Sequence, residues 1–285
     1  RHTGRTLVID WRDTDWTHDP EEPIDRWFTL QGVDTLPLAD FFALYREHRA
    51  ALAVAPAAWE DCLEDPGYPR WIYRPAYHHS PDQGALEAIV KGAPDLPEPV
   101  VVYPGVGHRT FSYSDCGRIQ LAPWVQAQIL QQARELALHA GHYDVVHLRG
   151  GSKAWAGGKV PLKTLDEKIH QTWPTQESYL SDLHGRYRQQ TAGQPPRELL
   201  ILTDRRPLGE AWITAYGCGR MIPPLNEHMA ESGTHKMKAD KLADIGIRKE
   251  ALTVEMLRDF CIMLNARQVI SDGVSVFSKM GARCA

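Results

Sequence analysis

The second half of the chain alternates short apolar runs with longer amphipathic stretches, and this alternation limits its fold more than any other feature. The apolar runs predict strands at 143–148, 198–202, 221–222 and 268–271. The stretches between and after them predict helices at 176–190, 208–216, 254–266 and 274–282. Strands that are apolar on both sides are typical of a parallel sheet covered by helices on each face. We therefore predict a Rossmann-like α/β domain here.

The first half carries weaker signals of the same kind. These signals predict strands at 6–11 and 99–103 and a helix at 38–49. Residues 17–37 contain Pro20, Pro23 and Pro37 and are predicted to form a loop. The first half is therefore also expected to be α/β.

A long helix is predicted just before the first strand of the second half. It covers 124–140, with Pro123 in its first turn and Gly141 as its C-terminal stop. Regular alternation of strands and helices begins after this helix, which favours a boundary near Gly141. We expect two domains, one at 1–141 and one at 142–285.

Composition excludes several classes of protein. The chain has 285 residues, of which 43% are hydrophobic and 24% charged, as in ordinary globular domains. No apolar run approaches the roughly 18 residues that a transmembrane helix needs. The formal net charge of −4 argues against a nucleic-acid-binding protein held mainly by electrostatics. The five cysteines are scattered without a CxxC pair, which favours reduced thiols and a cytoplasmic location.

The start of the chain looks like the end of a helix. Residues 1–5 (RHTGR) combine basic side chains with Gly4, a pattern typical of a last helical turn. A strand is predicted directly after it. We expect an upstream helix and further sequence before Arg1.

Residues that follow the predicted strands are the first functional candidates, because ligands of parallel sheets bind beyond the carboxyl ends of the strands. His147 lies near the end of the strand 143–148, and Arg149, Gly150 and Gly151 follow it. A guanidinium offers a planar fork of donors to a phosphate, and glycines let backbone N–H groups approach it closely. The alternative is a surface ion pair beside a glycine turn.

Two other strand ends carry polar residues. Thr203 and Asp204 follow the strand 198–202, where Asp204 would bind a ribose hydroxyl, act as a base or cap the next helix. Asp272, Ser275 and Ser278 follow the strand 268–271 and begin a predicted helix. Helix N-termini bind anions through free N–H groups and the helix dipole. Ordinary helix capping by Asp272 or Ser275 is the alternative.

Two further candidates lie away from these strand ends. Asp13 and Asp15 follow the strand predicted at 6–11, where a carboxylate would serve as a general base. His235 lies in a polar stretch that would close over a nucleotide or remain a surface loop.

Familiar motifs for other chemistry are incomplete. Thr110 occupies the third glycine position of a G-x-G-x-x-G sequence, so the dinucleotide fingerprint fails. Gly158 and Lys159 lack the remaining residues of a P-loop, which argues against a kinase or sulfotransferase. His78 and His79 are adjacent and cannot share one helical face as a zinc-binding pair. No metal site is expected.

The first twelve residues (RHTGRTLVIDWR) closely resemble the first-strand region of rhizobial NodZ-type α-1,6-fucosyltransferases. Residues 146–151 are similar to the family's His-x-Arg-x-Gly stretch, whose arginine contacts the donor diphosphate and matches Arg149 here. Residues 202–204 resemble its Cys-Thr-Asp strand end, and residues 233–235 its Gly/His loop.

The same family has a Ser-Ala-Phe-Thr-Arg helix start that holds the donor. The matching positions here are Ser275, Val276, Phe277, Ser278 and Lys279. This sequence departs from the family pattern at Ser152-Lys153, which replace polar and acidic residues, and at Asp272-Gly273, which replace a Pro-Pro pair. Residues 13–140 show no such similarity.

The resemblance implies a GT-B-like arrangement, in which two Rossmann-like domains face a central cleft. The acceptor would bind the N-terminal domain and the nucleotide sugar the C-terminal domain. It implies a metal-independent glycosyltransferase with no cofactor, with Arg149 neutralising the leaving phosphate. The partners would be a nucleotide sugar and a glycan acceptor, without nucleic acid or a transmembrane segment.

Several alternatives stay open within this interpretation. The donor would be GDP-fucose or another sugar such as CMP-Kdo, in a pathway for bacterial surface or signalling glycans. Asp204 is the alternative catalytic carboxylate: in place of a general base at Asp13 or Asp15, it would act as a nucleophile in a retaining reaction. The protein would work in the cytoplasm or at the periphery of the inner membrane. A non-catalytic glycan-binding protein with a degenerate transferase fold is the alternative from another class.

Overall fold

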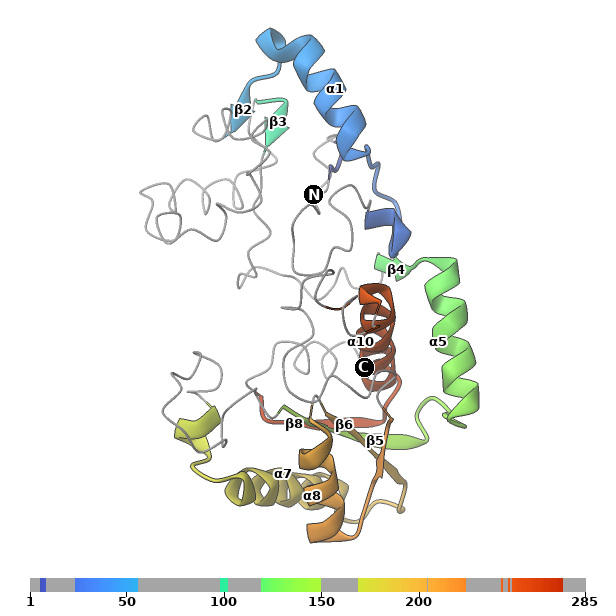
Figure 1. The fold of residues 1–285 in the computed structure, drawn as a ribbon, viewed down its shortest axis with the longest axis vertical. Helices are drawn as coiled ribbons and strands as arrows, with labels where there is room; N and C mark the ends of the chain where they lie inside the picture. Colours follow the sequence, from blue (N-terminus) through green and yellow to red (C-terminus); the bar gives the residue numbers. More distant parts are fainter. Residues whose placement is uncertain are drawn as a thin grey trace. The chain divides into compact units, whose positions relative to one another are not determined.

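The computed structural model describes residues 6–8, 24–55, 98–101, 119–149, 169–203, 205–223, 242, 246 and 248–273. The chain divides into two compact units, Arg1–Ala122 and Pro123–Ala285 (Figure 1). Helix α5 (Pro123–Glu135) belongs to the second unit because it packs on helix α10 (Lys249–Leu264). The division therefore falls before α5, whereas the sequence places the boundary near Gly141.

The second unit is built on a four-stranded parallel sheet in the order β7-β6-β5-β8. Its strands are β5 (Tyr143–Leu148), β6 (Glu198–Thr203), β7 (Arg220–Met221) and β8 (Gln268–Ser271). All six residues of β5 are buried, as expected for a central strand covered on both faces. The predicted Rossmann-like sheet is confirmed, with the bounds of β5 and β8 as predicted.

Helices cover both faces of this sheet (Figure 1). Helices α7 (Gln176–Thr191) and α8 (Arg206–Tyr216) pack on one face through Leu183 and Trp212. The other face packs against Ile262 and Met263 of α10. Because side chains alternate along a strand, Val146 and Leu148 join the first cluster while Tyr143 and Val145 join the second.

Local sequence explains where these helices begin and end. Thr175 starts α7 with a reciprocal capping box: its hydroxyl accepts from the Ser178 N–H at 3.0 Å, while its own N–H donates to the Ser178 hydroxyl at 3.2 Å. Helix α8 has a proline in its first turn and ends at Gly217, whose φ of 61° is left-handed.

The predicted helix 124–140 is too long. Helix α5 ends at Glu135, and Ala137 then adopts a left-handed φ of 53°. The turn therefore comes before Gly141, whose φ is 73°. Helix α10 differs in the opposite sense, since it begins at Lys249, upstream of the predicted start at 254.

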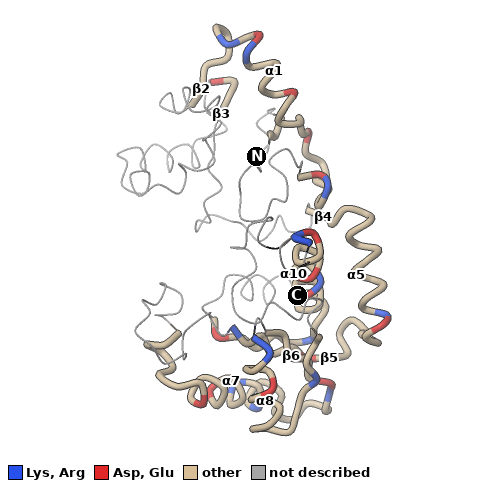
Figure 2. The backbone as a smooth tube through the Cα atoms, viewed as in Figure 1, with Lys and Arg blue, Asp and Glu red and all other residues tan. Residues whose placement is uncertain are grey.

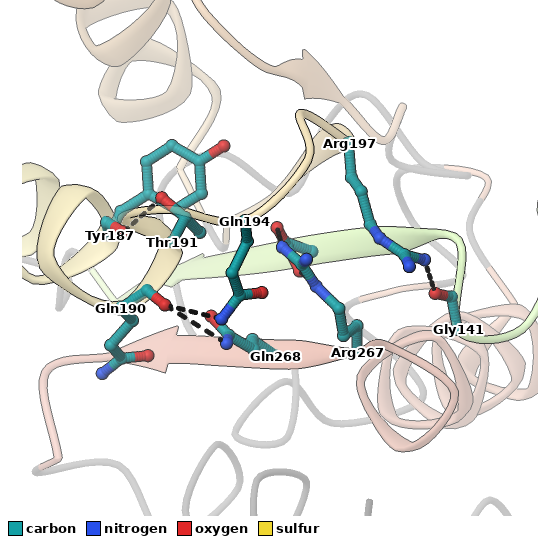
Figure 3. Close-up of polar contacts among 9 residues, drawn as sticks. Gly141, Tyr187, Gln190, Thr191, Gln194, Arg197, Arg267 and Gln268 are labelled. Carbon is teal, nitrogen blue, oxygen red and sulfur yellow. Dashed lines mark hydrogen bonds and ion pairs between the residues drawn. The ribbon is translucent and has the colours of Figure 1, made fainter.

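The amino-terminal edge of the sheet is held by polar contacts (Figure 3). Arg267 forms a two-pronged ion pair with Asp144, with Nε–Oδ1 at 2.8 Å and Nη2–Oδ2 at 2.5 Å. Arg197 donates to the Gly141 carbonyl. Gln194 and Gln268 both donate to the Gln190 carbonyl, at 3.1 and 3.4 Å. The bond from Gln268 ties the start of β8 to the end of α7, and the Arg267–Asp144 pair ties it to β5.

The first unit contains two small sheets in its described residues. Strand β1 (Phe28–Leu30) pairs antiparallel with β4 (Ile119–Leu121), and β2 (Val54–Ala55) pairs parallel with β3 (Val100–Val101). The prediction of a loop at 17–37 is therefore wrong in part, because these residues include β1 and the 3-10 helix η1 (Ile24–Arg26).

Helix α1 (Leu38–His48) of the first unit confirms the helix predicted at 38–49. A second 3-10 helix, η2 (Arg49–Ala51), follows it directly. Of the strand predicted at 6–11, residues 6–8 are described, and Leu7 forms an isolated parallel bridge with Thr35. A second Rossmann-like domain in this half stays a prediction.

Positions of Lys and Arg are interspersed with positions of Asp and Glu along the described backbone of the second unit (Figure 2). None of the helices in the described part of the chain is long and apolar enough to cross a bilayer.

Candidate functional site

The strand order of the second unit creates a switch point between β5 and β8. From β5 the chain continues through α7 to its neighbour β6 on one side, and later enters β8 on the other side of β5. Connections that leave a parallel sheet in opposite directions open a crevice beyond the carboxyl ends of the two strands, and ligands of α/β proteins bind there. The residues after β5 and β8 therefore form the candidate site.

Arg149 and Asp272 occupy these two strand ends, and the hydroxyl of Tyr179 connects them. The backbone N–H of Arg149 donates to Tyr179 Oη at 2.9 Å. Tyr179 Oη in turn donates to Asp272 Oδ2 at 3.3 Å. Tyr179 is fully buried and Asp272 is 5% exposed, so the connection is protected from water. The structure thus brings together two of the residues predicted from sequence.

Further contacts hold α7 at the end of β8. The ring of Trp173 meets Tyr179 edge-on, with centroids 5.1 Å apart, and its indole N–H donates to Asp182 at 3.0 Å. Asp182 pairs with Arg186 at 2.7 Å, and Arg186 donates to the Ser271 carbonyl at 3.2 Å. We call Trp173, Tyr179, Asp182 and Arg186 the α7 contact network. It fixes the tyrosine hydroxyl relative to β8.

Thr203 ends β6, and its hydroxyl is engaged in a local turn. It accepts from the Arg205 N–H at 3.0 Å and donates to the Arg205 carbonyl oxygen at 3.1 Å. Arg205 is the N-cap residue of α8, without a capping bond from its side chain. The turn therefore orders the start of α8. Binding of the donor by Thr203 stays a prediction.

His147 is a buried residue of β5, only 5% exposed. It lies between Leu202 of β6 and Ser271 of β8 in the sheet register. Strand alternation places its side chain on the same face as Tyr143 and Val145. Binding of the nucleotide sugar by His147 stays a prediction.

Two groups in the core, Tyr143 and Cys261, have clearly raised pKa values. Burial raises the pKa of Tyr143 to about 12, with a smaller contribution from Cys261. Burial also raises the pKa of the Cys261 thiol to about 11. Both groups are therefore protonated near neutral pH, and neither suits a nucleophilic role.

The other predicted site residues lie outside the described part of the chain. They are Asp13, Asp15, Gly150, Gly151, Asp204, His235, Ser275, Val276, Phe277 and Ser278. Their assignments stay predictions.

No protein-family model and no curated protein sequence matches this chain. Solved structures do match. A crystal structure of NodZ α-1,6-fucosyltransferase co-crystallised with GDP aligns with a TM-score of 0.61 at 17% identity, over 98% of this chain and 82% of that one. The chain has the NodZ fold. A NodZ structure from Bradyrhizobium aligns with a TM-score of 0.60 at 18% identity, over the same shares of the two chains.

The likeness to NodZ confirms, at the level of fold, the resemblance seen in the sequence. Another structure of this group is of NodZ soaked with GDP-fucose. The mixed α/β class is also confirmed.

Tyr179 connects the ends of β5 and β8, and the sequence does not predict it as a site residue. Its neighbours Leu180 and Leu183 belong to the same core cluster, so its position in the helical pattern is typical of core packing. The sequence has no separate signal for its hydroxyl bonds, because both partners follow strands that lie far away along the chain.

Proposed function

We propose that the protein is a glycosyltransferase that moves a sugar from a nucleotide-sugar donor to a glycan acceptor. The observation that supports it most is the position of Arg149, directly after β5 at the switch point of a chain with the NodZ fold. A guanidinium at this edge suits the diphosphate of a nucleotide sugar, because its donor fork matches phosphate oxygens.

In the proposed reaction the bond between the anomeric carbon and the diphosphate oxygen breaks, and its electron pair stays on that oxygen. Arg149 stabilises the growing negative charge, helped by the helix start predicted at Ser275. The acceptor hydroxyl forms the new bond to carbon and loses its proton to a carboxylate, for which we propose Asp13 or Asp15. We propose that neither a metal ion nor a resident cofactor takes part.

The proposal includes a two-domain GT-B arrangement. The acceptor binds the first unit, Arg1–Ala122, and the donor binds the second unit, Pro123–Ala285. The Rossmann-like sheet of the second unit supports the donor half of this assignment.

The donor we propose is GDP-fucose or a related GDP-sugar. The supporting observation is that the similar NodZ structures include one with GDP and one soaked with GDP-fucose. The product would belong to a bacterial surface or signalling glycan. The alternative donor is a CMP-linked sugar such as Kdo, with Asp204 as a nucleophile in a retaining reaction.

A calorimetric titration of the full chain with GDP-, UDP-, CMP- and dTDP-sugars tests this proposal. We expect saturable binding of the GDP-sugar and at least tenfold weaker binding of the other three classes, about 1.4 kcal/mol apart. Preferred binding of the CMP-sugar would favour the alternative donor. Binding of a glycan with no affinity for any nucleotide sugar would instead indicate a degenerate transferase fold and contradict the proposal.

A further inference from the structure

The carboxyl ends of β5 and β8 are joined by one hydroxyl group. Tyr179 Oη accepts from the Arg149 backbone N–H and donates to the Asp272 carboxylate. The two strands have no direct register pair at this point, because the ladder between them ends at His147 and Ser271. The tyrosine hydroxyl therefore connects the two strands one residue beyond their last register pair, at the switch point.

The hydroxyl is well suited to hold these strand ends in one position. A chain of hydrogen bonds that ends on a carboxylate polarises each member, and burial strengthens the electrostatic interactions along it. Tyr179 is fully buried, and its ring is held edge-on by Trp173. The capping box at Thr175 fixes the helical turn from which the ring projects.

The negative charge of Asp272 gives its hydrogen bond with Tyr179 a second consequence. A free carboxylate beside a bound diphosphate would repel it, since like charges at close range oppose each other. The hydrogen bond from Tyr179 and the 5% exposure of Asp272 keep this carboxylate turned into the protein. Asp272 thus serves the site as an acceptor for the tyrosine rather than as a ligand of the donor.

We infer that Tyr179 is a positioning residue of the donor site: its hydroxyl sets the place of Arg149 relative to the end of β8, and Asp272 is its anchor. The inference rests on the proposed function, because it assigns Arg149 to the diphosphate of a nucleotide. It adds a role for α7, a helix whose sequence indicates only core packing.

Replacing Tyr179 with phenylalanine tests the inference, because it removes the hydroxyl and keeps the ring. We expect Tyr179→Phe to weaken the binding of GDP about tenfold, as measured by calorimetry on the full chain. The substitution Asp272→Asn keeps an oxygen that accepts from Tyr179 but removes the negative charge, so it should weaken GDP binding in the same direction and by less than Tyr179→Phe does.

Tyr143→Phe is the matched control. It also removes one buried tyrosine hydrogen bond, from Oη to the Ile262 carbonyl at 3.0 Å, but its ring lies in the core cluster of the opposite face. Its stability loss in urea should be similar to that of Tyr179→Phe, while its affinity for GDP should be unchanged. A purely structural role of Tyr179 would instead give the two variants equal losses in GDP affinity.

A double-mutant cycle shows whether Tyr179 acts through Arg149. In an Arg149→Ala background, Tyr179→Phe should change GDP affinity by less than about twofold, because the side chain it positions is gone. Full tenfold weakening in that background, or unchanged affinity of the single variant, would overturn the inference. Absence of GDP binding by the wild type would overturn the proposed function together with the inference.

Discussion

Replacing Arg149 with alanine is expected to lower the turnover of the donor by about 10²–10³-fold, the usual loss when one donor to a developing oxyanion is removed. Arg149 follows β5, and its backbone N–H is held by Tyr179 at 2.9 Å. The backbone from which the Arg149 side chain projects is therefore held in place at the proposed diphosphate site. The measurement is the rate of GDP release from a GDP-sugar in the presence of a glycan acceptor.

Two variants serve as controls for this loss. Arg149→Lys keeps the charge without the planar donor fork, and should lie between wild type and Arg149→Ala. Arg134→Ala removes an exposed arginine from the last turn of α5 and should leave turnover unchanged. These two variants and Arg149→Ala should all keep the wild-type circular dichroism spectrum. Near-normal turnover of a folded Arg149→Ala variant would contradict the assignment of Arg149 to the donor.

The largest effect on stability is expected at Asp144. Its side chain is 1% exposed and forms a two-pronged pair with Arg267, which is 18% exposed. Removing one partner of a buried pair leaves the other charge without compensation, which typically destabilises a protein by about 3–5 kcal/mol. We expect Asp144→Ala to lower the free energy of unfolding by about 3 kcal/mol, near the lower limit because Arg267 has some access to water. Urea denaturation measures this change.

An exposed ion pair in the same unit provides the comparison. Arg206 and Glu210 pair on α8 at 2.9 Å with side chains that are 53% and 55% exposed. Water and salt screen such pairs, so Glu210→Ala should change the free energy of unfolding by less than about 1 kcal/mol. Equal effects of Asp144→Ala and Glu210→Ala would show that burial does not determine the strength of the Asp144 pair.

The parallel sheet of the second unit was predictable from sequence because its central strands β5 and β6 are largely buried and carry short apolar stretches between helical segments. The bounds of β5 and β8 are those predicted, although neither strand is purely apolar: β5 contains Asp144 and His147, and β8 begins at Gln268 and ends at Ser271. Strands β1 and β4 were not predictable in the same way. Each has three residues, and they pair across about ninety positions of the chain, so neither carries a local pattern.

The candidate site was predictable only in part, because the sequence marks where strands end but not which strands lie side by side. Arg149 and Asp272 were identified because each follows a recognisable strand, and strand ends hold the ligands of parallel sheets. The sequence does not specify that β5 and β8 are neighbours, which is what brings the two residues together. Tyr179 was missed because a buried aromatic side chain on a helix looks the same whether its hydroxyl is used or not.

The central claim is that the carboxyl ends of β5 and β8 bind the diphosphate of a nucleotide sugar. Amide hydrogen exchange of the full chain, with and without saturating GDP, tests it most directly. We predict slower exchange in peptides that cover the chain just after β5, from Arg149, and just after β8, from Asp272. Protection confined to other parts of the chain, or no protection at saturating GDP, would contradict the claim.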